Sequence, residues 1–335
     1  MVGHMTTVLL RTPAGGVGYP TLTANLRSTI KFAGYEIPPE DPSRGPDVSI
    51  SIGTPEELNA MDPTPGVNIA YMLLDNPFID TEPVWGVSQQ YDRIVVVDEV
   101  CAQLLQEAGG VPRTSIISIP PARVEKATSA DYHWHAKSVV RKAVLGDGDP
   151  GAIVIGTQWC DDMSSVFQIV AEIKCQADRP VKLLICGMPG KSGEDVLCDG
   201  NGLDPEKEVF ACPDPADEDF FSVADLVLAP QCDSWWPETV VGALECGVPV
   251  AGVDEHIVGS LISDRCGLPL EPKLFYRGAK AYRRTPCPAD AAKAILEALT
   301  SGELATYASV ARDWLERYEP FAPRNVVRRW REVLG

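Results

Sequence analysis

Histidine is scarce in this chain, with four among 335 residues. Zinc sites use closely spaced cysteine and histidine ligands, and although ten cysteines are present, no two of them form a Cys-x-x-Cys pair. We therefore expect no structural zinc. Disulfides are not expected either, because a chain of this size buries a sufficient core without them. Reduced thiols predict a cytoplasmic protein.

Long apolar runs and basic residues are also lacking. No apolar stretch reaches the ~18 residues that a membrane span requires, and no signal peptide is recognisable. The 29 lysines and arginines are outnumbered by 47 aspartates and glutamates, which gives a formal net charge of −18. A field of that sign repels polyanions. We expect no membrane span and no non-specific nucleic-acid binding.

What the chain does have is an alternation of short apolar runs with helical patterns, in two successive sets. Such alternation is typical of parallel α/β domains, so we predict an α/β protein with two Rossmann-like domains. Strands are expected at residues 8–10, 48–52, 67–72, 94–97 and 115–119, and then at 152–155, 181–186, 226–228 and 248–251. Helices are expected at 21–33, after Asp98 as far as Gly109, and at 163–177, 239–246, 289–299, 304–318 and 325–334, and residues 220–224 are expected to end a further short helix.

The boundary between the two sets is expected at a polar stretch without clear periodicity, residues 120–135. The N-terminal domain then comprises residues 1–135 and the second domain residues 136–319. Ligands of such folds bind at the carboxyl ends of the strands. With two such domains, the cleft between them is the expected site.

A glycine-rich segment, Gly15-Gly-Val-Gly-Tyr19, follows the first predicted strand and opens the first helix. Glycine lets the backbone approach a ligand closely, and a helix N-terminus favours an anion. The dinucleotide fingerprint needs a third glycine and an acidic residue after the second strand, and both are missing. A substrate-facing loop around Gly16, Gly18 and Tyr19 is favoured, and a plain tight turn is the alternative.

The segment 237–250 carries the most information. It follows a predicted strand and a polar loop, and it opens a helix. Glu238 and Glu245 are seven residues apart, so they share one helix face, where carboxylates can accept hydrogen bonds from sugar or ribose hydroxyls. The alternative is that Glu238 stabilises the helix N-terminus and Glu245 is solvated.

Three motifs there, Asp225-Leu-Val-Leu-Ala-Pro230, Pro237-Glu-Thr239 and Ala243-Leu-Glu-Cys-Gly-Val-Pro-Val250, resemble the donor-site signature of GT-B glycosyltransferases of the family 4 type. Gly16-Val-Gly18 and the helix end Ala33-Gly-Tyr-Glu-Ile37 resemble the acceptor side of that family. The resemblance implies two domains facing each other across a cleft, with a last helix, residues 320–335, packed back on the first domain.

The resemblance further implies sugar transfer from a UDP- or GDP-linked nucleotide-sugar to a hydroxyl acceptor, with retention of configuration and without a metal or other cofactor. The acceptor can be a small molecule, a glycan, a protein or a modified nucleobase. Asp75 and Glu238 are the implied catalytic residues, and Gly16, Gly18 and Tyr19 the acceptor-binding ones. The implied donor-binding residues are Gly156, Thr157, Gln158, Gly187, Ser234, Trp235, Trp236, Pro237, Thr239 and Glu245.

This sequence departs from that family at two places. Counted back from Cys246 without gaps, the positions of the two family glutamates hold Ser234 and Gly242, so Glu238 and Glu245 fill these roles only with a shorter helix start. The family places an arginine and a lysine after the first strand of the second domain, whereas residues 156–162 contain no basic residue and include Asp161 and Asp162.

These departures keep other functions open. A catalytically degenerate relative acting as a binding subunit is the main alternative. A GT-B-fold nucleotide-sugar epimerase and a nicotinamide oxidoreductase are the others. The densest basic cluster, Arg277, Lys280, Arg283 and Arg284, is either a phosphate-binding site or a solvated face.

Overall fold

The computed structural model consists of two compact units, Met1–Ala127 together with Glu316–Gly335, and Thr128–Leu315. The predicted boundary at residue 135 lies outside the described residues. The structure describes residues 6–13, 19–38, 45–74, 80–121, 141, 151–159, 163–187, 202–204, 207–212, 218–230, 237–262, 266–277, 282–317 and 322–335.

The first unit is built on a parallel sheet whose described strands follow the chain order, β1-β2-β3-β4-β5. Its strands are β1 (Val8–Arg11), β2 (Val48–Gly53), β3 (Val67–Met72), β4 (Arg93–Val96) and β5 (Ile116–Ser118). Its helices are α1 (Pro20–Phe32), α2 (Pro55–Asn59), α3 (Thr81–Gln90), α4 (Glu99–Glu107) and α12 (Pro323–Leu334).

The strand order of the first sheet reverses at β1. The backbone of Glu36 forms a parallel bridge with Thr7, and its carbonyl accepts from the Val8 N–H. Backbone groups of successive residues point to opposite edges of a strand, so this bridge lies on the edge of β1 away from β2. The chain therefore leaves β1 first to one side, at Glu36, and then returns to the other side, at β2.

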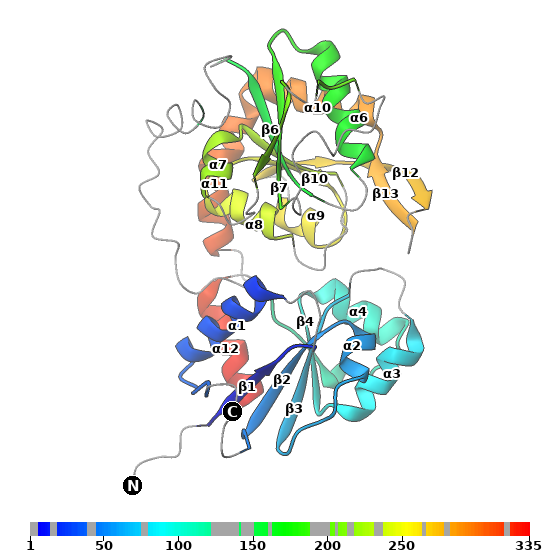
Figure 1. Cartoon of the computed structure of the whole chain (residues 1–335), viewed down its shortest axis with the longest axis vertical. Helices are drawn as coiled ribbons and strands as arrows, with labels where there is room; N and C mark the ends of the chain where they lie inside the picture. The colour runs from blue at the N-terminus through cyan, green and yellow to red at the C-terminus, as the bar shows by residue number, and fades with distance from the viewer. Residues whose placement is uncertain are drawn as a thin grey trace. The chain divides into compact units, whose positions relative to one another are not determined.

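Helices cover both faces of the first sheet, with α1 beside α12 on one face and α2, α3 and α4 on the other (Figure 1). Trp330 of α12 is fully buried and stacks on Tyr71 of β3 with ring centroids 6.2 Å apart. The Tyr71 hydroxyl donates to the carbonyl of Ile119 (2.8 Å). Burial raises the pKa of Tyr71 well above its ordinary value, so the phenol stays neutral.

Arginine side chains fix α12 to this unit through backbone carbonyls. Arg93 donates to the carbonyl of Val333 at 2.9 Å, and Arg329 donates to that of Ser118 at 2.6 Å. Arg331 donates to the carbonyl of Ala33, which follows α1, at 3.0 Å. Terminal helix carbonyls lack intrahelical partners and are favourable sites for a cation. The last helix of the chain therefore belongs to the first unit.

The second unit has a parallel sheet of strand order β11-β10-β9-β6-β7-β8. The strands are β6 (Ile153–Gln158), β7 (Val181–Cys186), β8 (Val209–Cys212), β9 (Leu226–Ala229), β10 (Val250–Val253) and β11 (Gly267–Leu270). The helices are α6 (Ser164–Gln176), α7 (Glu218–Val223), α8 (Glu238–Glu245), α9 (His256–Ile262), α10 (Pro288–Ser301) and α11 (Glu303–Arg317). A short antiparallel pair, β12 (Pro272–Arg277) and β13 (Tyr282–Pro286), follows β11.

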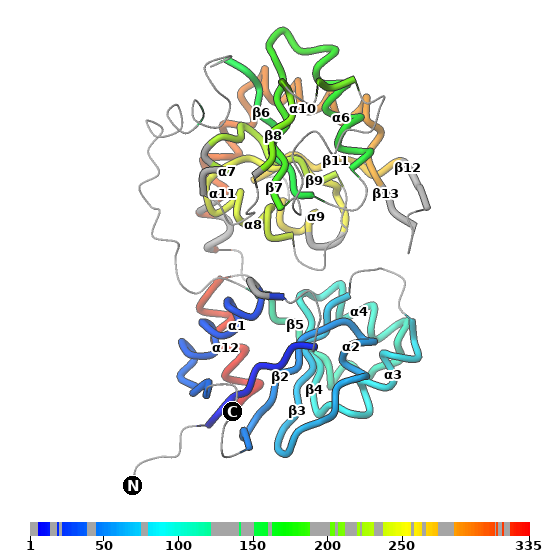
Figure 2. The backbone as a smooth tube through the Cα atoms, viewed as in Figure 1, coloured from blue at the N-terminus to red at the C-terminus, as the bar shows by residue number. Residues whose placement is uncertain are grey.

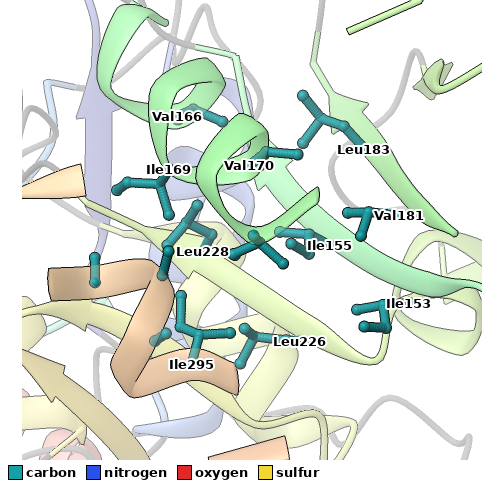
Figure 3. Packing of buried hydrophobic residues seen from close by; sticks show 14 of the residues in the cluster. Ile153, Ile155, Val166, Ile169, Val170, Val181, Leu183, Leu226, Leu228 and Ile295 are labelled. Carbon is teal, nitrogen blue, oxygen red and sulfur yellow. The ribbon is translucent and has the colours of Figure 1, made fainter. Parts of the chain in front are cut away.

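Aliphatic side chains of β6, β7 and β9 pack against α6 and α10 on one face of this sheet. Ile155, Leu183 and Leu228 are at most 1% exposed and face Val170 and Ile295 (Figure 3). The other face carries α7, α8 and α9, and Figure 2 shows α8 and α9 across the sheet from α6 and α10. The predicted α/β class with two Rossmann-like units is confirmed.

Glycines allow the helices on that second face to approach closely. A Cβ on Gly156 of β6 would lie 2.7 Å from Cζ of Phe220, and a Cβ on Gly242 of α8 would lie 2.6 Å from Cζ of Phe221. Both distances are shorter than the non-bonded contacts that Cβ atoms make in proteins. Phe220 and Phe221 pack edge to face at 5.0 Å. The absence of a side chain at Gly156 and Gly242 therefore sets how α7 packs.

The predicted strands and long helices are present within a few residues, and β3 and β7 have the predicted bounds. The prediction missed α2, α3, α9, β8, β11 and the β12–β13 pair. Helix α2 has five residues and α9 seven, too few for helical periodicity to appear in the sequence. The antiparallel pair has an uneven register between Pro272 and Leu274, which breaks the strict alternation of a strand.

We predict that Trp330→Ala lowers the free energy of unfolding of the first unit by about 3–5 kcal/mol, because it removes a fully buried indole. Trp330→Phe should cost less, since the buried indole N–H has no hydrogen-bond partner among the described residues. Urea denaturation followed by circular dichroism measures both. Arg328→Ala, on an exposed position of the same helix, is the control and should change stability by about 0.5 kcal/mol or less. Equal losses for Trp330→Ala and Arg328→Ala would contradict this packing.

Gly156→Ala should destabilise the second unit by about 1–3 kcal/mol through overpacking against Phe220. The matched control is Gly151→Ala, because a Cβ there meets nothing within 4 Å. Phe220→Leu in the Gly156→Ala background should restore part of the stability by removing the ring edge. Thermal unfolding of the wild type, the two glycine variants and the double variant tests this. A Gly156→Ala variant as stable as the wild type would show that the close approach of Phe220 is not required.

Candidate functional site

The second sheet reverses its strand order between β6 and β9. From β6 the chain continues to β7 and β8 on one side, and from β9 to β10 and β11 on the other. Crossovers between parallel strands are right-handed, so α6 and α8 leave the carboxyl ends of β6 and β9 toward opposite faces. Ligands of open α/β sheets bind outside the carboxyl ends of the strands at this kind of switch point. It is the candidate site of the second unit.

Three polar side chains meet at this switch point. Thr239, in the first turn of α8, donates its hydroxyl to Oε1 of Gln158 at 2.9 Å. Gln158 is the last residue of β6 and is half-buried. The Thr239 hydroxyl also lies 3.8 Å from Sγ of Cys186, the buried last residue of β7. The Gln158 side chain is thereby held by the Thr239 hydroxyl, and no described residue takes a hydrogen bond from its Nε2.

Thr157 has a different position from Gln158. Its hydroxyl donates to the carbonyl of Leu228 at 2.9 Å, and its side chain is 2% exposed. This bond adds to the short pairing between β6 and β9, in which Ile155 pairs with Leu226 and Gly156 with Val227. Thr157 therefore supports the switch point from inside the sheet, whereas Gln158 lies at its edge.

Helix α8 places its two glutamates at different ends. Glu238 is the first helical residue and follows the buried Pro237, and Glu245 is the last. Seven residues at about 1.5 Å each separate them by roughly 10 Å along the axis. Both residues have interaction partners within the chain. Glu238 lies at the carboxyl edge of the sheet, beside Thr239, and Glu245 lies toward the opposite edge.

Two predicted donor-binding glycines have clear backbone roles. Gly187 follows β7 with φ +73°, a conformation that favours glycine. Gly156 faces Phe220. Gly242, the position of a family glutamate in the ungapped comparison, faces Phe221 inside the unit, so that position carries no carboxylate toward the edge.

Asp225 of the signature lies at the amino edge of the sheet, away from the candidate site. Its carboxylate accepts from both terminal nitrogens of Arg141, at 3.0 and 2.8 Å, and from the Val154 N–H at 2.9 Å. The two side chains are 26% and 14% exposed. Arg141 also donates to the carbonyl of Ala152. Arg141 thereby links Ala152, the residue before β6, to Asp225, the residue before β9. Sequence patterns gave no indication of this ion pair.

The first unit has a second polar group at the corresponding edge. The Tyr19 hydroxyl, at the N-terminus of α1, donates to Oε2 of Glu57 in α2 at 2.8 Å. The same oxygen accepts from the Thr54 N–H at 2.9 Å. Tyr19 was predicted from the sequence, but Glu57 was missed because α2 was not recognised. A Thr-Pro-Glu-Glu capping-box pattern at 54–57 could have revealed it.

The other predicted site residues lie outside the described residues: Gly16, Gly18, Asp75, Ser234, Trp235 and Trp236. Of the basic cluster, Arg277 ends β12, and Arg283 and Arg284 belong to β13.

In the described part of the chain, no group of three potential metal ligands comes together. No described helix is long and apolar enough to span a bilayer. Cys101, Cys175, Cys186, Cys246, Cys266 and Cys287 are free thiols.

Comparison with known proteins gives matches only among solved structures. No protein-family model matches the chain, and no curated protein sequence does. HepE of Anabaena in complex with UDP-glucose is 15% identical with a TM-score of 0.68, over 99% of both chains. A glycosyltransferase of Rickettsia africae is 12% identical with a TM-score of 0.67, over 99% of this chain and 98% of that one.

A third similar structure is the sucrose-phosphate synthase of Thermosynechococcus elongatus, 11% identical with a TM-score of 0.65 over 98% of both chains. Identities this low carry the fold rather than a particular activity. Both Rossmann-like units take part in these matches, since the shared length is nearly the whole chain. The chain therefore has the GT-B fold, the fold of these glycosyltransferases.

Proposed function

We propose that this protein is a glycosyltransferase that moves a sugar from a UDP- or GDP-linked donor to a hydroxyl acceptor. The observation that carries the proposal is the Thr239–Gln158 pair at the switch point of the second unit, in a chain of GT-B fold. HepE, a structure similar over 99% of both chains, was solved with UDP-glucose. The donor is proposed to bind the second unit and the acceptor the first.

The donor site is proposed to act through neutral hydrogen-bond donors. In the transfer, the bond between the sugar and the diphosphate oxygen breaks, a bond to the acceptor oxygen forms, and the proton of the acceptor hydroxyl passes to the departing diphosphate. Negative charge develops on the departing diphosphate, and fixed donors aimed at it lower the barrier. The Gln158 amide nitrogen, oriented by Thr239, supplies two N–H groups. Backbone N–H groups of the first turn of α8 add to them.

Other roles follow the resemblance. Glu238 is proposed to bind sugar hydroxyls at the edge where α8 begins, and Glu245 the nucleotide ribose. Gly156, Thr157, Gly187, Pro237, Ser234, Trp235 and Trp236 complete the proposed donor site. Asp75, Gly16, Gly18 and Tyr19 are proposed to face the acceptor. Retention of configuration, transfer without a metal, hexosyl or pentosyl specificity and a cytoplasmic location are parts of the same proposal.

Isothermal titration of the full chain with UDP-glucose, GDP-mannose and NAD tests the proposal. Binding of at least one nucleotide-sugar and not of NAD is expected. Release of free UDP or GDP on adding acceptor distinguishes a transferase from a catalytically degenerate binding subunit, and conversion to an epimer of the donor would favour an epimerase. A chain that binds no nucleotide-sugar would refute the proposal.

Gln158→Ala should raise the Kd of the bound nucleotide-sugar by about tenfold or more, because hydrogen bonds to a charged group contribute about 1.5–3 kcal/mol. Thr239→Val should have a smaller effect, since it only releases the orientation of the Gln158 amide. The matched controls are Gln176→Ala, at the exposed end of α6, and Thr300→Val, at an exposed position of α10. Calorimetry that finds the same Kd for all four variants would remove Gln158 from the donor site.

Glu238→Gln and Glu245→Gln compare the two ends of α8 with the same chemical change. We expect Glu238→Gln to lower kcat/KM for the donor by about tenfold, the scale of one hydrogen bond between a charged group and a sugar hydroxyl. Glu245→Gln should change it less, because it lies roughly 10 Å further along the helix. Steady-state kinetics of nucleotide release measures both. A larger loss at Glu245 would place the donor away from the start of α8.

A further inference from the structure

The Tyr19–Glu57 hydrogen bond crosses the switch point of the first sheet. The strand order reverses at β1, so α1 covers one face of the sheet and α2 the other. Tyr19 precedes α1, and Glu57 lies in α2 after β2. Their hydrogen bond therefore joins the two helices that diverge from the carboxyl ends of β1 and β2, where ligands of such sheets bind.

The geometry around Glu57 leaves one carboxylate oxygen unused. Oε2 accepts from the Tyr19 hydroxyl and from the Thr54 N–H. An ionised carboxylate offers about four acceptor positions on two oxygens, and no described residue donates to Oε1. The side chain is only half-buried, so among the described residues Oε1 keeps its acceptor positions.

The backbone beneath the carboxylate is adapted to it. A Cβ on Gly53, the last residue of β2, would lie 3.0 Å from Oε2 of Glu57 and 3.1 Å from its Cβ. Gly53 therefore leaves room for the carboxylate to lie against the carboxyl end of β2. The capping box with Thr54 and the bond from Tyr19 together restrict the side chain to that place.

We infer that Glu57 binds a hydroxyl of the acceptor through Oε1, as an acceptor-binding and specificity-determining residue of the first unit. The inference rests on the proposed glycosyl transfer. A fixed carboxylate accepts hydrogen bonds from hydroxyls and repels a phosphate or carboxylate. The acceptor class is therefore a neutral sugar or polyol rather than an acidic one.

The test uses the full chain, the nucleotide-sugar that it binds, and two acceptors that differ only at C6, methyl β-D-glucoside and methyl β-D-glucuronide. The wild type should transfer to the glucoside and not to the glucuronide. Glu57→Gln keeps the capping box, since glutamine also serves at that position. The substitution removes the negative charge of the side chain and replaces one of its two oxygens by an NH2 group. We expect KM for the glucoside to rise about tenfold with little change in kcat, and transfer to the glucuronide to increase.

Glu56→Gln is the matched control, because Glu56 is the exposed neighbour on the same helix and the change removes the same charge. Tyr19→Phe, which releases Oε2 without changing charge, should raise KM for the glucoside by a smaller factor. Donor Kd and thermal midpoint should stay at the wild-type values in Glu57→Gln. These readouts separate a role in binding from one in folding.

The outcomes of this inference and of the proposed function are distinct. A wild type that binds no nucleotide-sugar contradicts the proposed function itself. A wild type that binds the donor but prefers the glucuronide, or uses neither glycoside, overturns the inference about Glu57. Equal acceptor preference in Glu57→Gln and Glu56→Gln overturns it as well.

Discussion

The right-handed crossover of parallel strands is the constraint on which the rest of this structure depends. Because each crossover has the same hand, a sheet whose strand order reverses must send its helices to opposite faces. Both sheets do so, at β1 in the first unit and between β6 and β9 in the second. Each switch point carries a side-chain hydrogen bond between diverging elements, Tyr19 to Glu57 in one unit and Thr239 to Gln158 in the other.

The chain has a net charge of −18, and four of its described arginines have structural roles. Arg93, Arg329 and Arg331 donate to backbone carbonyls around α12. Arg141 pairs with Asp225 at the amino edge of the second sheet. These cations stabilise the two units, and the polar groups that meet at the second switch point are an amide, a hydroxyl and a thiol. The proposed donor site therefore depends at these three groups on the orientation of dipoles rather than on net charge.

Much of the fold could be predicted because buried parallel strands are continuous apolar runs, and β3 and β7 could be delimited from such runs alone. Short elements could not, since five residues of α2 do not reveal a period. The missed helix mattered for the inference about the acceptor, because Glu57 lies on it. The signature segment 225–250 includes α8, which begins at the second switch point, yet the Asp225 carboxylate itself accepts from Arg141 and Val154. A sequence motif marks a segment, and the strand direction decides which of its ends meets a ligand.

By itself, the sequence determined the α/β class, the two sets of alternating elements and the segments that approach the carboxyl edges, because burial periodicity and glycine positions are local properties. Tertiary structure alone decided which side chains meet. Gln158 and Thr239 are 81 residues apart and Tyr19 and Glu57 are 38 apart. The need for glycine at 156 and 242 became clear only from the close contacts with Phe220 and Phe221. The physical reason is that strand order, set by packing of the whole sheet, brings distant strand ends to one edge.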